Sequence, residues 1–306
     1  MDFLDELRSL KDQFKFKGKF DLHISDFTRI VYVGMGGSAI AGRIFSEIFD
    51  EKEFLVLGDG SLPQYLGKES LLIAGSYSGS TEETLSAVKQ AKSRNMTVFG
   101  LGTGGPLEKL CDQWVSIPAG FQPRSSIGFF ITALARTFLR ETKDLEEASR
   151  VVEGLDSNSE FLSKIVDRIF SGKKTPVVYS FLPYSSVAYR WRTQFNENAK
   201  VIAMSHVFPE LDHNEIVGLW KTYGKENLFF IVAGKPEDKR LEKRISVTME
   251  MTNTEYTIVE QRGESLLARA MYLVHCGDYL SYYLALRRKI DPEDVSIITE
   301  LKRSLA

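Results

Sequence analysis

The sequence predicts an α/β protein built from two doubly wound parallel-sheet domains, each an α/β/α sandwich. Three observations predict it. Short apolar runs alternate with helix-like patterns, this alternation stops in a charged segment near the middle and restarts, and one short motif occurs in both halves. The 306 residues are enough for two ordinary domains. We place them at residues 1–145 and 146–306, because charge dominates residues 140–150.

Four buried parallel strands are predicted in the first half, because their segments are short, largely apolar and followed by small residues: RIVYVG, FLVL, LLIAGS and TVFGL. Helical spacing separates these strands, as in residues 81–94. Residues 124–142 predict a long buried helix, because IGFFITALARTFL is apolar on most faces. With the four strands, this pattern favours the doubly wound sheet.

The second half repeats this alternation with strands predicted at PVVYSF, KVIAMS, NLFFIVAG and EYTIVE. A long helix follows over residues 264–289. A last helix is predicted to start with Asp291 as N-cap and Pro292 in the first helical position. SAIAGR (residues 38–43) and SSVAYR (residues 185–190) agree at three positions and each opens a helix after a strand, which favours two copies of one unit and a C-terminal helix.

Composition and charge exclude several classes of protein. The net charge of −2 gives no general attraction to nucleic acid or to anionic membranes. The N-terminus is acidic and amphipathic, unlike a secretory signal, and no apolar run approaches the ~20 residues that cross a bilayer, so we expect a cytoplasmic protein. Cys111 and Cys276 are expected to be reduced thiols, and no His, Cys or Asp cluster has metal-site spacing. We therefore expect neither metal nor cofactor.

In the stretch VYVGMGGSAIAG, glycines follow directly at the end of the first predicted strand and are typical of a loop that binds a phosphate-containing ligand. Gly34, Gly36 and Ala39 fit the dinucleotide fingerprint, and Asp59 lies at a distance that suits a ribose contact. A nicotinamide oxidoreductase is therefore one hypothesis. A P-loop is excluded because no Gly-Lys-Ser/Thr follows the glycines.

The stretch GSYSGSTEETLSAV, after the third predicted strand, points to a different ligand. Its turn could be a plain capping box, with Ser80 as N-cap and Glu83 three residues later. Four hydroxyl groups within six residues exceed what a cap requires: Ser76, Ser78, Ser80 and Thr81. A helix N-terminus with extra hydroxyl donors is an anion site. With Gly36–Ser38 at the neighbouring strand end, it suits one terminal phosphate better than a pyrophosphate.

GMGGSAIAG and SYSGSTEET together resemble the sugar isomerase (SIS) domain, a sugar-phosphate-binding α/β module. QPRSSIG, FNENAK, PELDHNEI and the C-terminal DP..V..I..LK pattern resemble the bifunctional phosphoglucose/phosphomannose isomerases, in the right order along the whole chain. The resemblance implies an intramolecular oxidoreductase that interconverts glucose 6-phosphate, and mannose 6-phosphate, with fructose 6-phosphate. It implies ring opening, a cis-enediolate and a homodimer with shared active sites.

The resemblance also implies roles for individual residues. Glu197 would be the catalytic base, His213 the ring-opening residue, which reaches the site from the partner subunit, and Arg124 the cation facing the reacting carbons. Lys302 corresponds to a lysine of the last helix. The phosphate site would comprise Gly37, Ser38, Ser76, Ser78 and Thr81.

Two positions depart from the family pattern. Asp212 stands where asparagine is more common, and an acidic neighbour could favour protonated His213. Ser80 also stands where asparagine is common.

The residue types allow competing interpretations. Glu197 could be a surface glutamate, and Arg124 could form a structural ion pair. Among the four histidines, His206 is the second choice for ring opening. His275 is expected to pack between helices, whereas His23 has no chemistry nearby. Two alternatives to the isomerase stay open: a non-catalytic SIS-type sugar-phosphate-binding regulator, and the nicotinamide enzyme.

Overall fold

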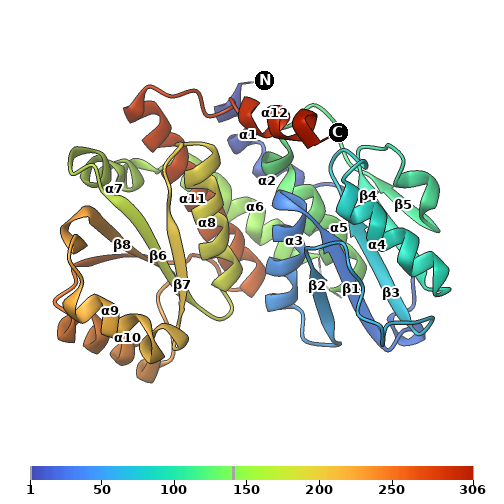
Figure 1. The fold of residues 1–306 in the computed structure, drawn as a ribbon, viewed down its shortest axis with the longest axis horizontal. Helices are drawn as coiled ribbons and strands as arrows, with labels where there is room; N and C mark the ends of the chain where they lie inside the picture. Colours follow the sequence, from blue (N-terminus) through green and yellow to red (C-terminus); the bar gives the residue numbers. More distant parts are fainter. Residues whose placement is uncertain (1, 140–141, 306) are drawn as a thin grey trace. The chain divides into compact units, whose positions relative to one another are not determined.

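The computed structural model describes residues 2–139 and 142–305, which form two compact units (Figure 1). The N-terminal unit comprises Leu4–Glu153 with Gly263–Ala268, and the C-terminal unit comprises chiefly Gly154–Arg262 and Arg269–Ala306. Helix α6 (Lys143–Asp156) and helix α11 (Leu266–Arg288) therefore contribute residues to both units.

The N-terminal unit is built on a five-stranded parallel sheet in the order β2-β1-β3-β4-β5. Its strands are β1 (Arg29–Gly34), β2 (Phe54–Leu57), β3 (Ser70–Gly75), β4 (Thr97–Gly102) and β5 (Gln113–Ser116). Its main helices, besides α6, are α1 (Phe3–Arg8), α2 (Leu10–Gln13), α3 (Gly36–Ile48), α4 (Glu82–Ser93) and α5 (Ile127–Phe138). Short 3-10 helices are η1 (Ile24–Asp26), η2 (Glu108–Leu110) and η3 (Pro123–Ser126).

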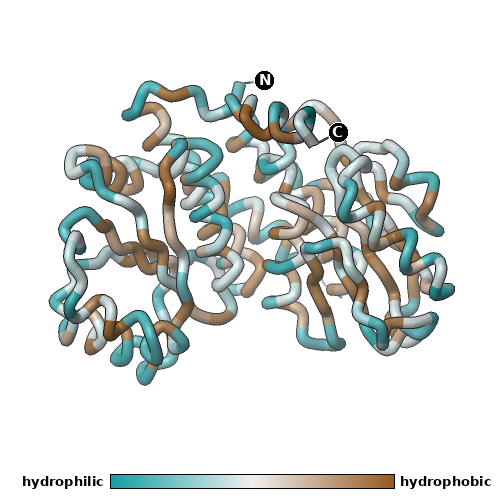
Figure 2. The backbone as a smooth tube through the Cα atoms, viewed as in Figure 1, coloured by the Kyte–Doolittle hydropathy of each residue, from teal (hydrophilic) through white to brown (hydrophobic). Residues whose placement is uncertain are grey.

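The four strands predicted for this unit are confirmed. Three of them, β1, β3 and β4, are apolar because the central strands of a parallel sheet are buried on both faces, whereas β2 is a half-buried edge strand. Every residue of β3 is buried, and Figure 2 shows the strands as largely hydrophobic segments. Strand β5 was not predicted: it is a short edge strand, and its sequence QWVS is only partly apolar. The helix predicted for residues 124–142 begins as η3 and ends at Phe138, and residues 140–141 lie outside the described part.

The order of these strands contradicts the dinucleotide hypothesis. A dinucleotide-binding sheet runs 3-2-1-4, whereas here β1 lies between β2 and β3, which is the flavodoxin-like order. In that order the strand sequence reverses between β1 and β3, and ligands bind at the carboxyl ends of these two strands. Gly34 of β1 is paired with Gly75 of β3, so both small-residue loops start from this point.

The C-terminal unit contains a four-stranded parallel sheet in the order β7-β6-β8-β9. Its strands are β6 (Thr175–Phe181), β7 (Met204–Phe208), β8 (Leu228–Ala233) and β9 (Tyr256–Val259). Its helices, besides α11, are α7 (Glu160–Ser171), α8 (Ser185–Glu197), η4 (Glu210–His213), α9 (Glu215–Lys221), η5 (Lys225–Asn227), α10 (Lys239–Met251) and α12 (Ser296–Leu305). Numbered within the unit, the order is 2-1-3-4, as for the first four strands of the N-terminal sheet. The expectation of two copies of one α/β unit is confirmed.

Two elements of the C-terminal unit start later than predicted. The strand expected at KVIAMS begins at Met204, because residues 201–203 connect α8 to the strand and the side chain of Ile202 is exposed. The last helix begins at Ser296 rather than after Asp291. The Asp291 carboxylate instead accepts a hydrogen bond from the Glu293 N–H, and Asp294 accepts one from the Ser296 N–H at 3.0 Å. Asp294, two residues before the first helical residue, therefore binds the start of the helix in place of Asp291.

Helices α8 and α11 pack together through buried groups. The Arg190 guanidinium donates to both carboxylate oxygens of Asp278, from Nε at 3.1 Å and from Nη2 at 2.9 Å. Trp191 is fully buried, and its indole N–H donates to the Leu273 carbonyl at 2.8 Å. Its ring occupies the space beside Gly277, where a Cβ would lie only 2.2 Å from the ring. The contact therefore requires a residue without a side chain.

No helix among residues 2–139 and 142–305 combines the length and apolarity that spanning a membrane requires.

Replacing Gly277 by alanine is expected to destabilise the C-terminal unit by about 1–3 kcal/mol, because the new methyl group overlaps the Trp191 ring. Gly154→Ala is the matched control, since Gly154 is also helical and a Cβ there would meet no atom within 4 Å. That variant should gain roughly 0.5–1 kcal/mol from helix propensity. Urea unfolding of both variants measures the difference, and a stabilising Gly277→Ala would contradict the packing described.

Candidate functional site

The carboxyl ends of β1 and β3 lead into two helices whose first turns have no side-chain cap. Helix α3 follows Met35, and helix α4 follows Thr81; neither N-cap side chain makes a capping hydrogen bond. The alternative interpretation, a capping box of Ser80 and Glu83, is therefore wrong, since Thr81 is the N-cap residue. Free N–H groups at a helix N-terminus carry a partial positive charge. Two such ends at neighbouring strands make an arrangement that can bind an anion.

The hydroxyl groups before α4 lie close together. The Ser76 and Thr81 hydroxyl oxygens are 2.8 Å apart, and those of Ser78 and Ser80 are 2.9 Å apart. Gly79 between them has a φ of +63°, and a Cβ there would lie 1.6 Å from the Gly104 carbonyl oxygen. The loop is thus held tightly against residues 103–107, which fixes the hydroxyls at the start of α4.

The start of α3 packs against η3, which carries the predicted arginine. A Cβ on Gly37 would lie 3.1 Å from the Arg124 Cα, so the absence of a side chain permits this close approach. Ser38 and Arg124 are both buried. Arg124 Nη1 donates to the Gln122 side chain at 3.3 Å, and the Gln122 N–H donates to the buried Glu6 carboxylate at 3.1 Å. The structure therefore brings together Gly37, Ser38 and Arg124.

Asp59 has no position suited to a ribose. It follows the edge strand β2, its side chain is exposed, and its carboxylate accepts a hydrogen bond from the Ser61 N–H at 3.1 Å. The carboxylate thus closes its own turn. With the strand order, this placement removes the basis of the nicotinamide hypothesis.

In the C-terminal unit, Glu197 is the last residue of α8 and is half-buried. The chain then turns through residues 198–203 into the amino end of β7. The following residues are anchored: the buried Asn198 side chain donates to Ser281 Oγ at 2.9 Å, and Lys200 Nζ donates to the Glu197 carbonyl at 2.8 Å. The base predicted from the family resemblance therefore lies at a firmly held helix end.

His213 ends η4 and is exposed, and anchored carboxylates flank it. Asp212 accepts hydrogen bonds from Thr248 Oγ1 at 2.8 Å and from Arg244 at 3.2 Å, both on α10. A carboxylate offers two acceptor oxygens where an asparagine would offer one. Asp212 therefore fixes the segment before His213 to α10.

On the other side of His213, Glu215 begins α9 and joins it to the sheet. Its carboxylate accepts a hydrogen bond from the Tyr179 hydroxyl on β6 at 2.5 Å and lies 3.1 Å from Nδ1 of His206 on β7. Burial, and then the Glu215 carboxylate, raise the pKa of Tyr179 well above its usual value, so its hydroxyl stays a donor. Sequence reasoning missed Glu215, for which the only signal was an acidic residue in the first turn of α9.

The remaining histidines are accounted for. Nδ1 of His206 lies against Glu215, as described. His275 is fully buried, and its Nε2 lies 2.7 Å from the Asp156 carboxylate, which confirms its role in helix packing. His23 is exposed beside η1. His206 is exposed on a strand paired with β6, whereas His213 is exposed on the short segment held by Asp212 and Glu215.

Glu197 and His213 lie beyond opposite ends of β7. Glu197 precedes the loop into the amino end of this strand, whereas η4 and α9 follow its carboxyl end (Figure 1). Five residues at about 3.3 Å per residue separate the first and last Cα atoms of β7 by about 13 Å. Within one C-terminal unit, the two side chains are therefore not adjacent.

Lys302 lies within α12, but its side chain falls outside the described residues. Cys111 and Cys276 are free thiols, as expected, and burial raises the pKa of Cys111 to about 12 and also that of Cys276. Neither is thus a thiolate at neutral pH. In the described part of the chain, no three His, Cys, Asp or Glu side chains gather as a candidate metal site.

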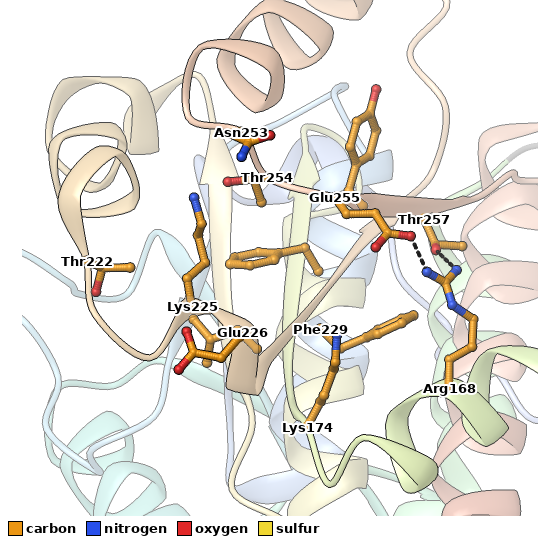
Figure 3. A pocket seen from close by; sticks show the side chains of 13 residues that line it. Arg168, Lys174, Thr222, Lys225, Glu226, Phe229, Asn253, Thr254, Glu255 and Thr257 are labelled. Carbon is orange, nitrogen blue, oxygen red and sulfur yellow. Dashed lines mark hydrogen bonds and ion pairs between the residues drawn. The ribbon is translucent and has the colours of Figure 1, made fainter.

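A groove of about 350 Å³ lies at the amino ends of β6, β8 and β9, away from the predicted residues (Figure 3). Two of its cations take part in contacts within the unit: Arg168 pairs with Glu255 and donates to Thr257 Oγ1 at 3.2 Å. Lys225 Nζ donates to the Thr252 carbonyl at 2.5 Å. Arg168 and Lys225 therefore have protein partners for their hydrogen bonds.

Comparison with known proteins places these features in a family. Residues 23–142 match the model of the SIS domain, and residues 163–305 match that of the bacterial phospho-glucose isomerase C-terminal SIS domain. The bifunctional phosphoglucose/phosphomannose isomerase of Thermoplasma acidophilum is 44% identical over 100% of this chain and 98% of its own. The protein of the same name from Aquifex aeolicus is 32% identical, over 92% of each chain.

Solved structures agree on the fold. A glucose-6-phosphate isomerase like protein from Thermus thermophilus superposes with a TM-score of 0.67 at 19% identity, over 98% of this chain and 93% of its own. The two-domain SIS fold is thus shared even where the sequence has diverged. Identity over the full length, with both domain models matched in order, shows that this chain belongs to the bifunctional phosphoglucose/phosphomannose isomerase family.

Proposed function

We propose that this protein is an aldose–ketose isomerase that interconverts glucose 6-phosphate and mannose 6-phosphate with fructose 6-phosphate. The observation that carries the proposal is the pair of uncapped helix N-termini at the β1–β3 reversal, in a chain that is 44% identical to a named isomerase over its full length. We further propose that the enzyme acts in cytoplasmic sugar metabolism.

The 6-phosphate would bind at the starts of α3 and α4. An anion there interacts with main-chain N–H groups and with the positive end of both helix dipoles. The Ser76 and Thr81 hydroxyl oxygens are 2.8 Å apart, so both hydroxyls can donate hydrogen bonds to oxygens of the same phosphate group. The proposed phosphate-binding residues are Gly37, Ser38, Ser76, Ser78 and Thr81.

The reaction then has two parts. The closed sugar must first open, which needs an acid at the ring oxygen and a base at the anomeric hydroxyl, and a histidine can serve both near neutral pH. We assign this step to His213. A base then removes the proton from C2 to give a cis-enediolate and returns a proton to C1. Glu197 suits this step, because a carboxylate with a pKa near ~4.3 is ionised at neutral pH and can reach two adjacent carbons.

The same intermediate accounts for both aldose substrates. Glucose 6-phosphate and mannose 6-phosphate differ only at C2, so removal of that proton gives one enediolate. Its negative charge requires a nearby cation, and we assign Arg124 to this role, because it is buried beside the proposed phosphate site. The hydrogen moves within one substrate molecule, so the balance of the reaction includes no external oxidant or reductant. Lys302 stays a proposed member of the site.

We propose a homodimer in which His213 acts in the site of the partner subunit. The separation of Glu197 and His213 along β7 supports this assignment, because one C-terminal unit does not bring both to two adjacent carbons. Apolar side chains on the helices beside His213 are exposed, including Trp220 on α9 and Met251 on α10. Such a surface is typical of a protein interface.

Glu197→Gln is expected to lower kcat for fructose 6-phosphate by ~10²–10⁴, because the base is lost, with little change in KM. A coupled assay for glucose 6-phosphate measures both constants. Glu250→Gln is the control, since Glu250 is an exposed glutamate near the C-terminal end of α10. Turnover near wild type in Glu197→Gln would rule out Glu197 as the base. If the wild-type protein instead binds fructose 6-phosphate without turnover, it is the sugar-phosphate-binding regulator.

Ser76→Ala and Thr81→Val should each weaken binding of inorganic phosphate and raise KM by about tenfold, because each removes a hydrogen bond to a charged group. Inhibition by inorganic phosphate and steady-state kinetics give the two values. Ser93→Ala removes a hydroxyl from the opposite end of α4, where it donates to the Gln90 carbonyl, and should change neither. An unchanged phosphate inhibition constant in Ser76→Ala and Thr81→Val would argue against this phosphate site.

Mixing Glu197→Gln with His213→Ala tests the shared site. If each site takes Glu197 from one subunit and His213 from the other, a mixed dimer has one intact site, and random reassembly restores about a quarter of wild-type activity. Each variant alone should be nearly inactive with cyclic substrate. Reassembled mixtures that stay inactive, although size measurements show mixed dimers, would place both groups in one subunit.

A further inference from the structure

The sequence FNENAK contains polar residues beside Glu197 that the proposed reaction does not use. The structure gives each of them a contact within the C-terminal unit. Asn196 accepts a hydrogen bond from the Ala203 N–H at 3.2 Å, and Asn198 donates to Ser281 on α11 at 2.9 Å. Lys200 donates to the Glu197 carbonyl itself at 2.8 Å. The segment around the proposed base is therefore tied at several points.

The turn after α8 is wider than comparable turns in this protein. The turn after helix α7 contains a residue at positive φ, Lys173. The N–H of the next residue, Lys174, donates to the carbonyl of Ile169, five residues earlier. Helices α4, α10 and α11 end in the same way. After α8, Lys200 has a φ of +50°, but the next N–H, of Val201, bonds to Phe195, six residues back. One more residue is thus accommodated at the end of α8.

Cationic side chains satisfy the carbonyl groups of this wide turn. The last carbonyls of a helix lack partners within the helix and carry partial negative charge. Lys200 Nζ binds the Glu197 carbonyl, and Arg288 Nη1 donates to the carbonyls of Ala199 and Lys200. Arg288 is the last residue of α11, so its hydrogen bonds join α11 directly to the end of α8.

Lys200 also joins this turn to a segment far away in sequence. Its ammonium donates to the Asp291 carbonyl at 2.7 Å and lies 3.4 Å from the Pro292 carbonyl oxygen. An ammonium has three N–H donors, which matches the three main-chain oxygens around it. The main chain of Glu197 therefore cannot move relative to the turn after α11 without breaking these hydrogen bonds.

We propose that Lys200 is a positioning residue for Glu197: its ammonium holds the end of α8 so that the Glu197 carboxylate can serve both carbons of the substrate. The proposal rests on the proposed function. Transfer of a proton from C2 to C1 demands closer placement than abstraction alone, because one carboxylate must reach both carbons before the proton exchanges with water. A misplacement of about 1 Å can lower the rate ~100-fold.

Lys200→Met tests the proposal. We expect kcat to fall about 100-fold, with KM within a few-fold of wild type. The second readout is isotopic: with glucose 6-phosphate deuterated at C2, the fraction of fructose 6-phosphate that keeps deuterium at C1 should fall several-fold below wild type. Simple loss of folded protein would lower the yield of product but not the retained fraction per turnover.

Lys225→Met is the matched control. Lys225 lies in the same unit, and its ammonium also donates to main-chain carbonyls, but to those of Leu219 and Thr252, which lie outside the turn after α8. It should lose similar stability and keep both kcat and the retained deuterium. Lys200→Arg keeps a cationic donor and should recover part of kcat and part of the retained deuterium. If Lys200→Met does not fold, Lys200→Arg replaces it. Its kcat and retained deuterium should then lie below those of Lys225→Met.

The outcomes distinguish failure of the role proposed for Lys200 from failure of the isomerase assignment. If Lys200→Met matches Lys225→Met in kcat and retained deuterium, while Glu197→Gln is inactive, Lys200 has no positioning role and the isomerase assignment stands. If Lys200→Met loses kcat but keeps the wild-type retained fraction, the positioning role is also overturned. If the wild-type protein does not isomerise hexose 6-phosphates, the proposed function itself fails.

Discussion

The packing of Tyr32 is the constraint on which the carboxyl edge of the N-terminal sheet depends. Its fully buried ring occupies the space beside two glycines: a Cβ on Gly42 would lie 2.3 Å from the ring, and one on Gly75 would lie 2.0 Å from the hydroxyl oxygen. That hydroxyl donates to the Ser38 carbonyl at 2.9 Å. Burial raises the pKa of Tyr32 well above its usual value, so it remains a donor at any physiological pH. One side chain thus sets how α3 and β3 lie relative to β1.

The C-terminal unit repeats the strand order, but the segments that carry its proposed site residues are held in a different way. There, charged and amide side chains fix short segments to their neighbours: Asp212 to α10, Glu215 to the sheet, and Asn198 to α11. In the N-terminal unit, close approach through glycine shapes the proposed anion site, because main-chain N–H groups must come near a bound anion. Long-range hydrogen bonds instead hold the two residues that we assign to acid–base chemistry.

The sequence was sufficient to predict most of the strands and the two-unit organisation, because buried parallel strands are nearly continuous apolar runs. It also predicted the loops that lie together at β1 and β3. The edge strand β5 was not predictable, because it is short and only partly apolar. The delayed starts of β7 and α12 were not predictable either, because local turns at Lys200 and Asp294 decide them. The anchoring partners of Glu215 lie 9 and 36 residues away, on β7 and β6. No local pattern marks such contacts.

The length of β7 limits which deletions the C-terminal sheet can accept. Deleting one residue to bring His213 nearer to Glu197 would reverse which side of the sheet each following side chain faces. His206 would then turn away from Glu215, and the segment that carries His213 would lose its attachment to the sheet. A deletion of two residues would leave each following side chain on its original face of the sheet, but it would remove two of the five residues of β7. The pairing of β7 with β6 therefore fixes the separation of Glu197 and His213, and shortening the strand residue by residue would not bring them together.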